Sequence, residues 1–337
     1  MNAGVSSLSV DEIKRVSLAA LRAAGVSAEY ADIQVQLLLD AELRGVHSHG
    51  LLRLPRVIER IRSGACNPHV RGNGVWTGTA FLAMDGEHGF GPVVACHALE
   101  MLYARVESTG VAVAAVRNSE HLGMLAWYAQ QVAEKGLILI ALTVSEALVH
   151  PWGGSQAMLG TNPVAIGVPA APRPFVLDMA TSLVSMGKIH DYANRGKPIP
   201  EGWAVDGSGR PTIDADAAKD GAIAPFGGAK GYGLGLGFEL LVTALAGSAI
   251  GTDVVGTLDS TQPCNKGDVF IVIRPAGQAA DLIQDYLHAL RVSRPVDPAS
   301  PVRVPGDRGR QARTDHEQGN IDVDSRVWTQ IEQMARA

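Results

Sequence analysis

The stretch GLILIALTV, residues 136–144, is apolar except for Thr143 and carries no charge. A short apolar run that begins at a glycine predicts a strand buried on both faces, near the centre of a sheet. On its N-terminal side, the pattern predicts a helix over 123–135, a strand over 111–116 and a helix over 91–107. The middle of the chain is therefore predicted to be an α/β domain around a mixed sheet.

Further elements extend this sheet on both sides. Residues 192–226 are rich in Pro, Gly and Asp, which predicts a long excursion over the surface. A helix is predicted over 232–246 after a glycine-rich entry, and strands are predicted at 81–84, 163–168, 175–178 and 268–273.

Both ends of the chain have helical patterns. Helices are predicted behind Ser9, behind Ser27 and from around His49 to Leu51 as far as Ser63, and Ser9 with Glu12 forms a capping-box pattern. Two more are predicted at 278–292 and 324–335. We therefore expect two domains: residues 1–73 with 278–337 form a helical domain, and residues 74–277 form the α/β domain.

The composition is that of an ordinary globular protein. Of 337 residues, 46% are hydrophobic and 19% are charged, and 29 Lys and Arg against 34 Asp and Glu give a net charge of −5. This mildly acidic balance argues against nucleic acid as a partner. The longest apolar stretch, residues 137–144, is far too short to cross a membrane, and the N-terminus lacks the basic and apolar regions of a targeting segment.

The cysteines indicate a reducing environment. Cys66, Cys96 and Cys264 are odd in number, lie far apart and form no CxxC pattern. We therefore expect neither a disulfide framework nor a cysteine-based zinc site, and we expect the protein to be cytoplasmic.

The glycine-rich stretch GYGLGLG, residues 231–237, is a candidate for the dinucleotide fingerprint GxGxxG. When the pattern starts at 231, 233 or 235, its sixth position is Leu236, Phe238 or Leu240 instead of glycine. Every frame fails, so any dinucleotide is expected to bind in a fold other than the Rossmann fold.

The stretch RGVHSHGLLRLP, residues 44–55, places the side chains of Ser48, His49 and Arg53 within six residues. If a helix begins near Ser48, His49 and Arg53 are four residues apart and share one face. An imidazole beside a guanidinium offers a proton donor next to a carboxylate clamp, which is what reduction of a 2-oxo acid requires. The alternative is a capped helix with solvated His and Arg. Pro55 lies too deep for the first turn of such a helix and predicts a kink or a restart there.

Five further stretches place polar side chains or glycines between apolar segments. His121 in NSEHLG, residues 118–123, follows a predicted strand, where open α/β sheets bind their ligands. Lys230 lies in the glycine-rich loop 226–233, where backbone N–H groups and an ammonium suit a phosphate. Each stretch taken alone is equally consistent with an ordinary loop. The other three of these five stretches are WGG (152–154) with LGTNP (159–163), LDMATS (177–182) and VPGDRGR (304–310).

In order and spacing, these stretches resemble the malate/L-lactate dehydrogenase family of the second type, which is unrelated in fold to the Rossmann-type enzymes of the same name. That family includes ureidoglycolate dehydrogenase, diketogulonate reductase, sulfolactate dehydrogenase and Δ1-piperideine-2-carboxylate reductase. The resemblance implies a non-Rossmann nicotinamide-binding domain in a homodimer. It also implies hydride transfer between NAD(P)H and a small 2-oxo acid, a cyclic imino acid or the corresponding alcohol. The matching stretches are GVHSHGLLRLP, NSEHLG, PWGG, LGTNPVAIGVP, LDMATS, GGAKGYGL and VPGD, from residue 45 to 307.

The resemblance implies roles for individual residues. His49 matches the family's proton donor, Ser48 its hydrogen-bonding partner, and Arg53 the ligand of the substrate carboxylate. His121 matches a catalytic base in one branch and a cofactor contact in another, and Thr161 matches a substrate contact. Residues 74–277 are thus expected to bind both cofactor and substrate. Cofactor contacts match Ser145, Asp178, Met179, Ala180, Lys230 and the turn of Gly306, Asp307 and Arg308.

Two details bear on cofactor and substrate. Arg308 and Arg310 favour NADPH over NADH, because guanidinium groups match phosphate geometry. The stretch HLGMLAW, residues 121–127, lacks the aromatic-rich pattern of the imine reductases, which favours a hydroxy-acid substrate. Many relatives read Thr-Asn-Ser after the strand that ends near Thr143, whereas this chain reads Thr143-Val144-Ser145-Glu146 and so places a carboxylate near the expected site.

Three alternatives remain beside a 2-hydroxy-acid dehydrogenase. One is a reductase of cyclic imines such as Δ1-piperideine-2-carboxylate or Δ1-pyrroline-2-carboxylate, and another is a non-catalytic binding protein. The third is a metal-dependent hydrolase built on His47, His49 and His121. No carboxylate spacing such as HExxH supports that third reading, and we expect no metal.

Overall fold

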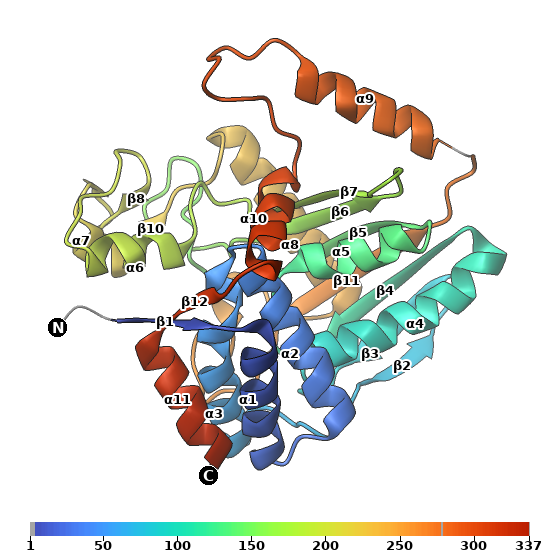
Figure 1. Ribbon diagram of the computed structural model, residues 1–337, viewed down its shortest axis with the longest axis horizontal. Helices are drawn as coiled ribbons and strands as arrows, with labels where there is room; N and C mark the ends of the chain where they lie inside the picture. The colour runs from blue at the N-terminus through green and yellow to red at the C-terminus, as the bar shows by residue number, and fades with distance from the viewer. Residues whose placement is uncertain (1–3, 278, 337) are drawn as a thin grey trace.

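The centre of the fold is a sheet of seven strands in the order β2-β3-β4-β11-β5-β6-β7, seen in a computed structural model that describes residues 4–277 and 279–336 (Figure 1). Strand β3 runs parallel to β4, and the other neighbouring pairs are antiparallel. This pairing differs from that of a doubly wound Rossmann sheet and confirms the predicted mixed sheet. The strands are β2 (Asn73–Trp76), β3 (Phe81–Asp85), β4 (Val111–Arg117), β5 (Ile138–Thr143), β6 (Val164–Val168), β7 (Phe175–Met179) and β11 (Gly267–Ile273).

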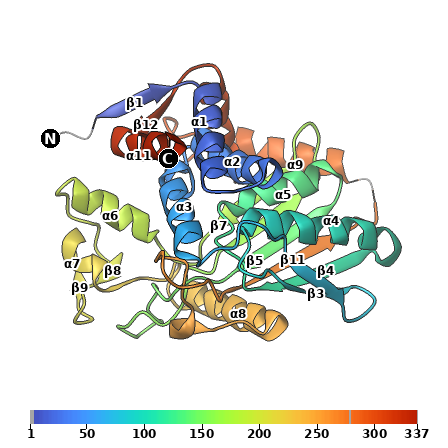
Figure 2. The same ribbon diagram turned by 90° about the horizontal axis from the view of Figure 1, so that it is seen from below.

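Helices cover the two faces of this sheet unequally (Figure 2). The helices α4 (Gly91–Thr109) and α5 (Leu125–Glu134) pack on one face, where Leu139 and Ala141 of β5 are fully buried. The other face carries α8 (Ala229–Ala246), and there Ile140 stays partly exposed. The apolar run at 136–144 is thus a central strand, as predicted, but one of its faces is incompletely covered.

A helical layer is built from both ends of the chain. The predicted caps form, since Ser9 Oγ accepts the N–H of Glu12 at 3.2 Å and Ser27 Oγ accepts that of Tyr30 at 3.3 Å. Two short strands, which the sequence analysis did not predict, pair antiparallel and join the two ends of the chain. The elements of this layer are β1 (Val5–Leu8), α1 (Val10–Ala23), α2 (Ala28–Leu43), α3 (Leu54–Ser63), β12 (Ile321–Asp324) and α11 (Ser325–Arg336).

Helix α2 belongs to both cores. Leu37 and Ala41 pack with the side chains between α4 and the sheet, whereas Leu38 packs with those of α1 and α11. The domain boundaries at 73 and 278 therefore stay a prediction. Residues 1–3, 278 and 337, which the predicted helical domain includes, lie outside the described residues.

The segment 192–226 differs from the predicted excursion. Together with α6 it folds around a small core that contains Ile189, Ile199 and Ile223. Strands of two residues give no periodic signal, so the sequence pattern did not reveal them. The elements are α6 (Met186–Asn194), β8 (Ala204–Val205), β9 (Pro211–Thr212), α7 (Ala215–Lys219) and β10 (Ala222–Ile223).

The last two helices before β12 differ in their packing. The helix predicted at 278–292 is observed as α9 (Ala280–Val292), and Figure 1 shows it standing away from the rest of the chain. The helix α10 (Asp307–Glu317) was not predicted, and it packs against α2. Within the described ranges, no helix is both long and apolar enough to cross a membrane.

Candidate active site

The segment 47–53 is held by a buried carboxylate. Glu42, near the end of α2 and 3% exposed, accepts the N–H of Leu51 at 2.7 Å and contacts Nδ1 of His47 at 2.5 Å. A Cβ on Gly50 would lie 2.2 Å from Oε1 of Glu42, so glycine lets the chain pass this carboxylate.

The third predicted helix, expected to begin around His49 to Leu51, begins later. The chain instead forms two 3-10 turns, His47–His49 and Leu51–Arg53, and α3 begins at Leu54 with Pro55 in its first turn. Proline fits a first turn because its missing N–H would have no partner there. The restart that Pro55 predicted is therefore observed.

Ser48, His49 and Arg53 nevertheless come together. Arg53 folds back so that its Nε donates to the carbonyl oxygen of Ser48 at 2.7 Å. The hydroxyl of Ser48 lies 3.0 Å from Nδ1 of His49. The hydroxyl thereby fixes one ring nitrogen, and Nε2 of His49 is left for a ligand.

The backbone between β4 and His121 packs tightly against Gly91, the first residue of α4. A Cβ on Gly91 would lie 2.5 Å from the carbonyl oxygens of both Glu120 and His121. The N–H of Gly123 donates to Nδ1 of His121 at 3.0 Å. Because Nδ1 accepts this bond, the neutral imidazole carries its proton on Nε2.

Gly123 provides a test of this geometry. It has a φ of 74°, and a Cβ there would lie 2.1 Å from Leu37 in α2. Gly110 has the same φ of 74° with nothing within 4 Å, so it is a matched control. We expect Gly110→Ala to lower the free energy of unfolding by about 1–2 kcal/mol from backbone strain. Gly123→Ala should cost about 1–3 kcal/mol more through overpacking. Chemical denaturation checks both values, and equal losses would contradict the tight packing at Gly123.

The two imidazoles face each other across the site. The ring centroids of His49 and His121 lie 5.5 Å apart, with a 32° angle between the planes. Burial, followed by the charge of Arg53, lowers the pKa of His49 to about 4. Burial also lowers the pKa of His121 well below its usual value, with smaller contributions from Arg53 and His49. Both rings are therefore neutral near pH 7 in the free protein.

These side chains line one cavity of about 40 Å³. An apolar part of the lining comes from α2, and a cationic part comes from α3 and from Arg53 just before it. The lining residues from these two parts are Gln34, Leu37, Leu38, Arg53, Arg56, Val57 and Arg60.

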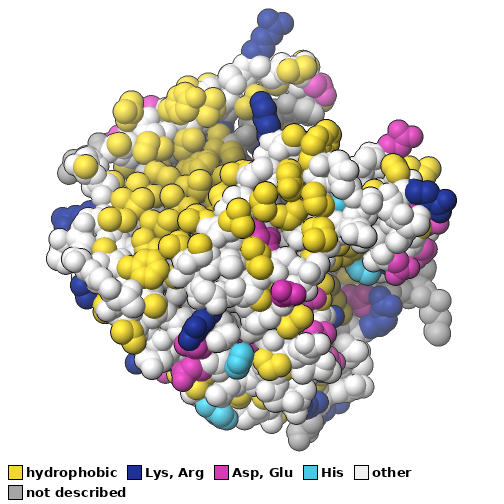
Figure 3. Space-filling view, turned by 180° about the vertical axis from the view of Figure 1, so that it is seen from behind, with side chains coloured by type: hydrophobic (Ala, Val, Ile, Leu, Met, Phe, Trp, Pro, Cys, Tyr) yellow, Lys and Arg dark blue, Asp and Glu magenta, His cyan; other side chains and the backbone are white. Residues whose placement is uncertain are grey.

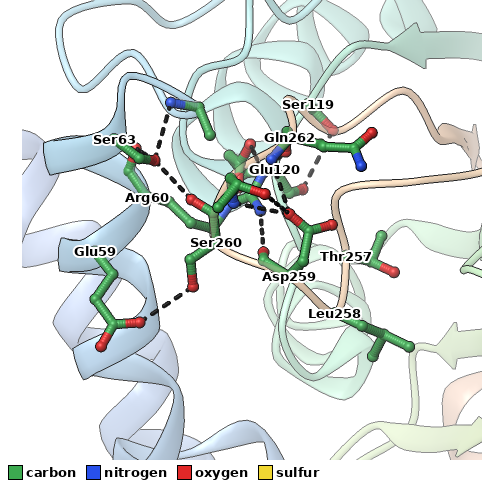
Figure 4. A network of polar contacts seen from close by, with 12 residues as sticks. Glu59, Arg60, Ser63, Ser119, Glu120, Thr257, Leu258, Asp259, Ser260 and Gln262 are labelled. Atoms are coloured by element: carbon green, nitrogen blue, oxygen red, sulfur yellow. Dashed lines mark hydrogen bonds and ion pairs between the residues drawn. The ribbon is translucent and has the colours of Figure 1, made fainter.

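Arg60 ties three parts of the cavity wall together (Figure 4). It is 4% exposed and forms a two-bond pair with Glu120, at 2.5 Å and 2.9 Å. It also donates to the carbonyl oxygens of Asp259 and, at 2.9 Å, Gln262. Helix α3, the segment before His121 and the loop 256–264 are thus fixed to one another. The sequence analysis missed this pair because its members are 60 residues apart and belong to no spacing pattern.

Hydrogen bonds join the segments that carry Ser145, Thr161 and Thr181. The N–H of Thr161 donates to Oγ of Ser145 at 3.1 Å. The hydroxyl of Thr181 donates to the carbonyl of Thr161 at 2.9 Å, and the carbonyl of Thr181 accepts the N–H of Phe226 at 3.1 Å. The segments around 161, 181 and 226, far apart in sequence, therefore lie side by side.

Asp178, Met179 and Ala180 follow one another at the end of β7, directly before Thr181, and Lys230 comes from α8. Asp178 accepts the N–H of Ala126, in the first turn of α5, at 2.7 Å. Met179 packs on the side of the sheet that carries α8, and Ala180 links it to Thr181. Lys230 is exposed in the first turn of α8.

The predicted turn at 306–308 is the start of α10. Gly306 has a φ of 89° and lies against the carbonyl of Val176 in β7, two residues before Asp178. Asp307 is engaged by Arg291, at 2.9 Å through each of two nitrogens, and by Arg310 at 2.5 Å. Arg308 is exposed. Asp307 therefore anchors the helix start, and Arg310 is committed to it.

His47 does not join the other two histidines. Its side chain is 60% exposed and pairs with Glu42. Over residues 4–277 and 279–336, no group of three or more His, Cys, Asp or Glu side chains is arranged to hold a metal ion.

The malate/L-lactate dehydrogenase family model matches residues 8–332. The chain belongs to this family. It is thus a nicotinamide-dependent oxidoreductase of the dehydrogenase and reductase class, as the sequence predicted.

Individual relatives are similar over nearly the whole chain. The crystal structure of a dehydrogenase from Sinorhizobium meliloti has a TM-score of 0.95 and 51% identity, and the match covers 99% of each chain. The L-sulfolactate dehydrogenase of Methanocaldococcus jannaschii is 34% identical, over 95% of this chain and 94% of its own. The Delta(1)-pyrroline-2-carboxylate reductase of Ancylobacter novellus is also 34% identical, over 96% of this chain and 98% of its own.

Glu146, the carboxylate that the sequence places near the expected site, supports a loop of the cavity wall. Its Oε1 accepts the N–H groups of Thr257 at 2.6 Å and Leu258 at 2.8 Å. Thr257 in turn lines the cavity. The extra carboxylate of this dehydrogenase is therefore used for positioning the loop.

Proposed function

We propose that this dehydrogenase reduces a small 2-oxo acid with NAD(P)H, with Arg53 binding the substrate carboxylate and His49 donating the proton. The observation that carries the proposal is the convergence of His49, Arg53 and His121 on one cavity, with Ser48 contacting both His49 and Arg53. The nicotinamide, when bound, supplies a hydride to the carbonyl carbon.

Arg53 prepares the site for an anion. Its Nε is used by the carbonyl of Ser48, so its two terminal nitrogens are left to bind a carboxylate in the two-bond geometry that guanidinium groups favour. Burial, followed by the charge of Arg56, lowers the pKa of Arg53 to about 10, so it remains charged near pH 7.

His49 acquires its proton when the anion binds. The substrate carboxylate offsets the charge of Arg53, which raises the pKa of His49 from its low value in the free protein. Nε2–H then protonates the forming alkoxide, while the hydroxyl of Ser48 accepts Nδ1–H and holds the ring. His121 acts beside it as a neutral hydrogen-bond donor through Nε2, toward substrate or cofactor.

The pH profile tests the state of His49. Oxidation of a 2-hydroxy acid needs the neutral imidazole as base, so acid removes activity by protonating it. Because the pKa of His49 is about 4, we expect kcat/KM for lactate oxidation to stay level from pH 8 to about pH 5 and to fall below that. A decline centred on the ordinary histidine value of 6.5 would contradict this environment.

The residues around β7 fit a dinucleotide. Gly228 and Gly306, with φ of 64° and 89°, precede the first turns of α8 and α10, where Lys230 and Arg308 are exposed. Helix N-termini with a nearby cation suit phosphate groups. Ser182, in the LDMATS stretch, is 6% exposed, and its hydroxyl has no hydrogen-bond partner among the described residues. We infer that Ser145, Asp178, Met179 and Ala180 complete this cofactor surface, and that Thr161, which donates its N–H to Ser145, contacts the substrate.

Arg308 is the residue we propose for selecting NADPH. It is exposed, whereas Arg310 is paired with Asp307. Arg308→Ala should raise KM for NADPH and leave KM for NADH unchanged, because only NADPH carries the additional phosphate. Equal KM changes for both cofactors would exclude this role.

The direct test of the function is loss of reduced-nicotinamide absorbance with purified protein. NADH and NADPH are offered separately with a panel of 2-oxo acids, with Δ1-piperideine-2-carboxylate as a further substrate. Turnover of a 2-oxo acid supports the proposal. Turnover of the cyclic imine alone would establish the second candidate, which the pyrroline-carboxylate reductase relative favours. Absence of turnover together with absence of cofactor binding would refute both.

We also propose that the protein is a homodimer. Behind α9, hydrophobic side chains gather over a hollowed area of the surface (Figure 3). The sheet face beside α8 leaves Val113, Ile140 and Ile271 partly exposed, and Leu282 and Tyr286 of α9 are 74% and 64% exposed. Exposed apolar areas of this kind mark association surfaces. Sedimentation equilibrium should give twice the mass of one chain, and Leu282→Asp should shift it toward one chain.

The cytoplasm is the proposed location. Cys66, Cys96 and Cys264 are all free thiols in the structure, and free buried thiols are usual in a reducing compartment.

A further inference from the structure

Helix α3 presents a row of arginines to the cavity. Arg53 lies at its start, Arg56 follows three residues later and Arg60 seven residues later, so the three share one face. All three line the cavity, together with His49 and His121. Three positive charges in one small cavity call for negatively charged groups close to them.

The protein itself balances one of these charges. Glu120 pairs with Arg60 through two hydrogen bonds, and Glu120 is the carboxylate that lines the cavity. Arg53 is held by a backbone carbonyl, which carries no net charge. In the part of the chain that the structure describes, neither Arg53 nor Arg56 forms an ion pair with a carboxylate. Two positive charges therefore face the space that the substrate enters.

Arg56 lies near the reacting groups. Burial is the main reason that the pKa values of Arg53 and His121 are lowered, and the charge of Arg56 contributes to both. Arg56 is half-buried rather than extended into solvent. A charge in this position interacts strongly with a ligand because the apolar wall from Leu37 and Leu38 excludes water.

We infer that Arg56 binds a second anionic group of the substrate, so that the enzyme prefers 2-oxo acids that carry two acid groups. This inference rests on the proposed function, in which Arg53 takes the carboxylate next to the reacting carbonyl. The second group is a carboxylate or a sulfonate, since a guanidinium binds either through two N–H groups. A dianion balances the two charges that Glu120 leaves uncompensated.

The test compares substrates that differ in the second acid group. Oxaloacetate and sulfopyruvate carry it, and 2-oxobutyrate is similar in size but lacks it. We expect Arg56→Gln to lower kcat/KM for both dianions by about 10- to 150-fold, the value of one charged hydrogen-bonding contact. The value for 2-oxobutyrate should change less than about twofold. Arg56→Lys should recover part of the loss, because it keeps the charge but not the two-bond geometry. The ratio of the oxaloacetate to the sulfopyruvate value identifies which second group the site prefers.

Arg62→Gln is the matched control, since Arg62 lies on the same helix but is exposed and outside the cavity. It should leave all three substrates unchanged. If Arg56→Gln lowered kcat/KM equally for the dianions and for 2-oxobutyrate, or lowered it for neither, this inference would be overturned. Reduction of 2-oxobutyrate by the wild type would still support the proposed function. Failure of the wild type to reduce any 2-oxo acid would overturn both.

Discussion

His49→Ala lowers kcat for 2-oxo acid reduction by about 10²- to 10⁴-fold, the usual contribution of a positioned general acid. KM changes little, because Arg53, which binds the substrate carboxylate, is held by the backbone of Ser48 and not by the imidazole. Steady-state kinetics with the best 2-oxo acid of the panel measures both constants. The loss is in kcat because the forming alkoxide receives its proton from Nε2–H of His49, the imidazole ring that the hydroxyl of Ser48 orients.

Two further variants separate this role from general damage to the segment. His47→Gln changes the neighbouring imidazole in the same 3-10 turn, which is exposed and pairs with Glu42, and it should leave kcat within a few-fold of wild type. Arg53→Lys should mainly raise KM, because lysine keeps the charge but loses the two-bond geometry. An unchanged kcat in His49→Ala would exclude His49 as the proton donor.

The sequence predicted the site where its residues are close in the chain. Ser48, His49 and Arg53 lie within six positions, so their proximity follows from any compact local fold, although the helix expected there begins only at Leu54. The residues missed were those whose contacts span the chain. Arg56 and Arg60 belong to a helix rich in arginine, and such a pattern is equally consistent with a solvated face.

The same distinction applies to the fold. The strand β5 could be predicted because a continuous apolar run indicates a buried strand. The helix caps at Ser9 and Ser27 could be predicted because each depends on only three or four neighbouring residues. The pairing of β1 with β12 joins residues more than 300 positions apart, as in Val5 with Asp324, and neither four-residue strand has a strong pattern. Similarly, α10 could not be predicted. Proline and glycine lie around its start, and few of its residues are apolar, so no helical hydrophobic pattern is visible.

Arg60→Ala should lower the free energy of unfolding by about 3–5 kcal/mol, because it leaves the buried carboxylate of Glu120 without its partner. Chemical denaturation at pH 8 measures the loss. Arg326→Ala is the control: this arginine pairs with Asp324 at the surface, its side chain is 75% exposed, and its loss should cost less than about 1 kcal/mol.

The effect of pH identifies the mechanism of this loss. Burial raises the pKa of Glu120 even with Arg60 opposing it, and removing Arg60 raises it further. A carboxyl group whose pKa is higher in the folded than in the unfolded state destabilises the fold at high pH, and the destabilisation is relieved as pH falls through the raised pKa. The deficit of Arg60→Ala should therefore shrink between pH 8 and pH 5. Arg60→Met combined with Glu120→Gln should recover much of the stability at pH 8, because neither side chain of this pair then carries a charge. A pH-independent deficit, unrelieved in the double variant, would show instead that Arg60 acts mainly through its contacts with the carbonyls of Asp259 and Gln262.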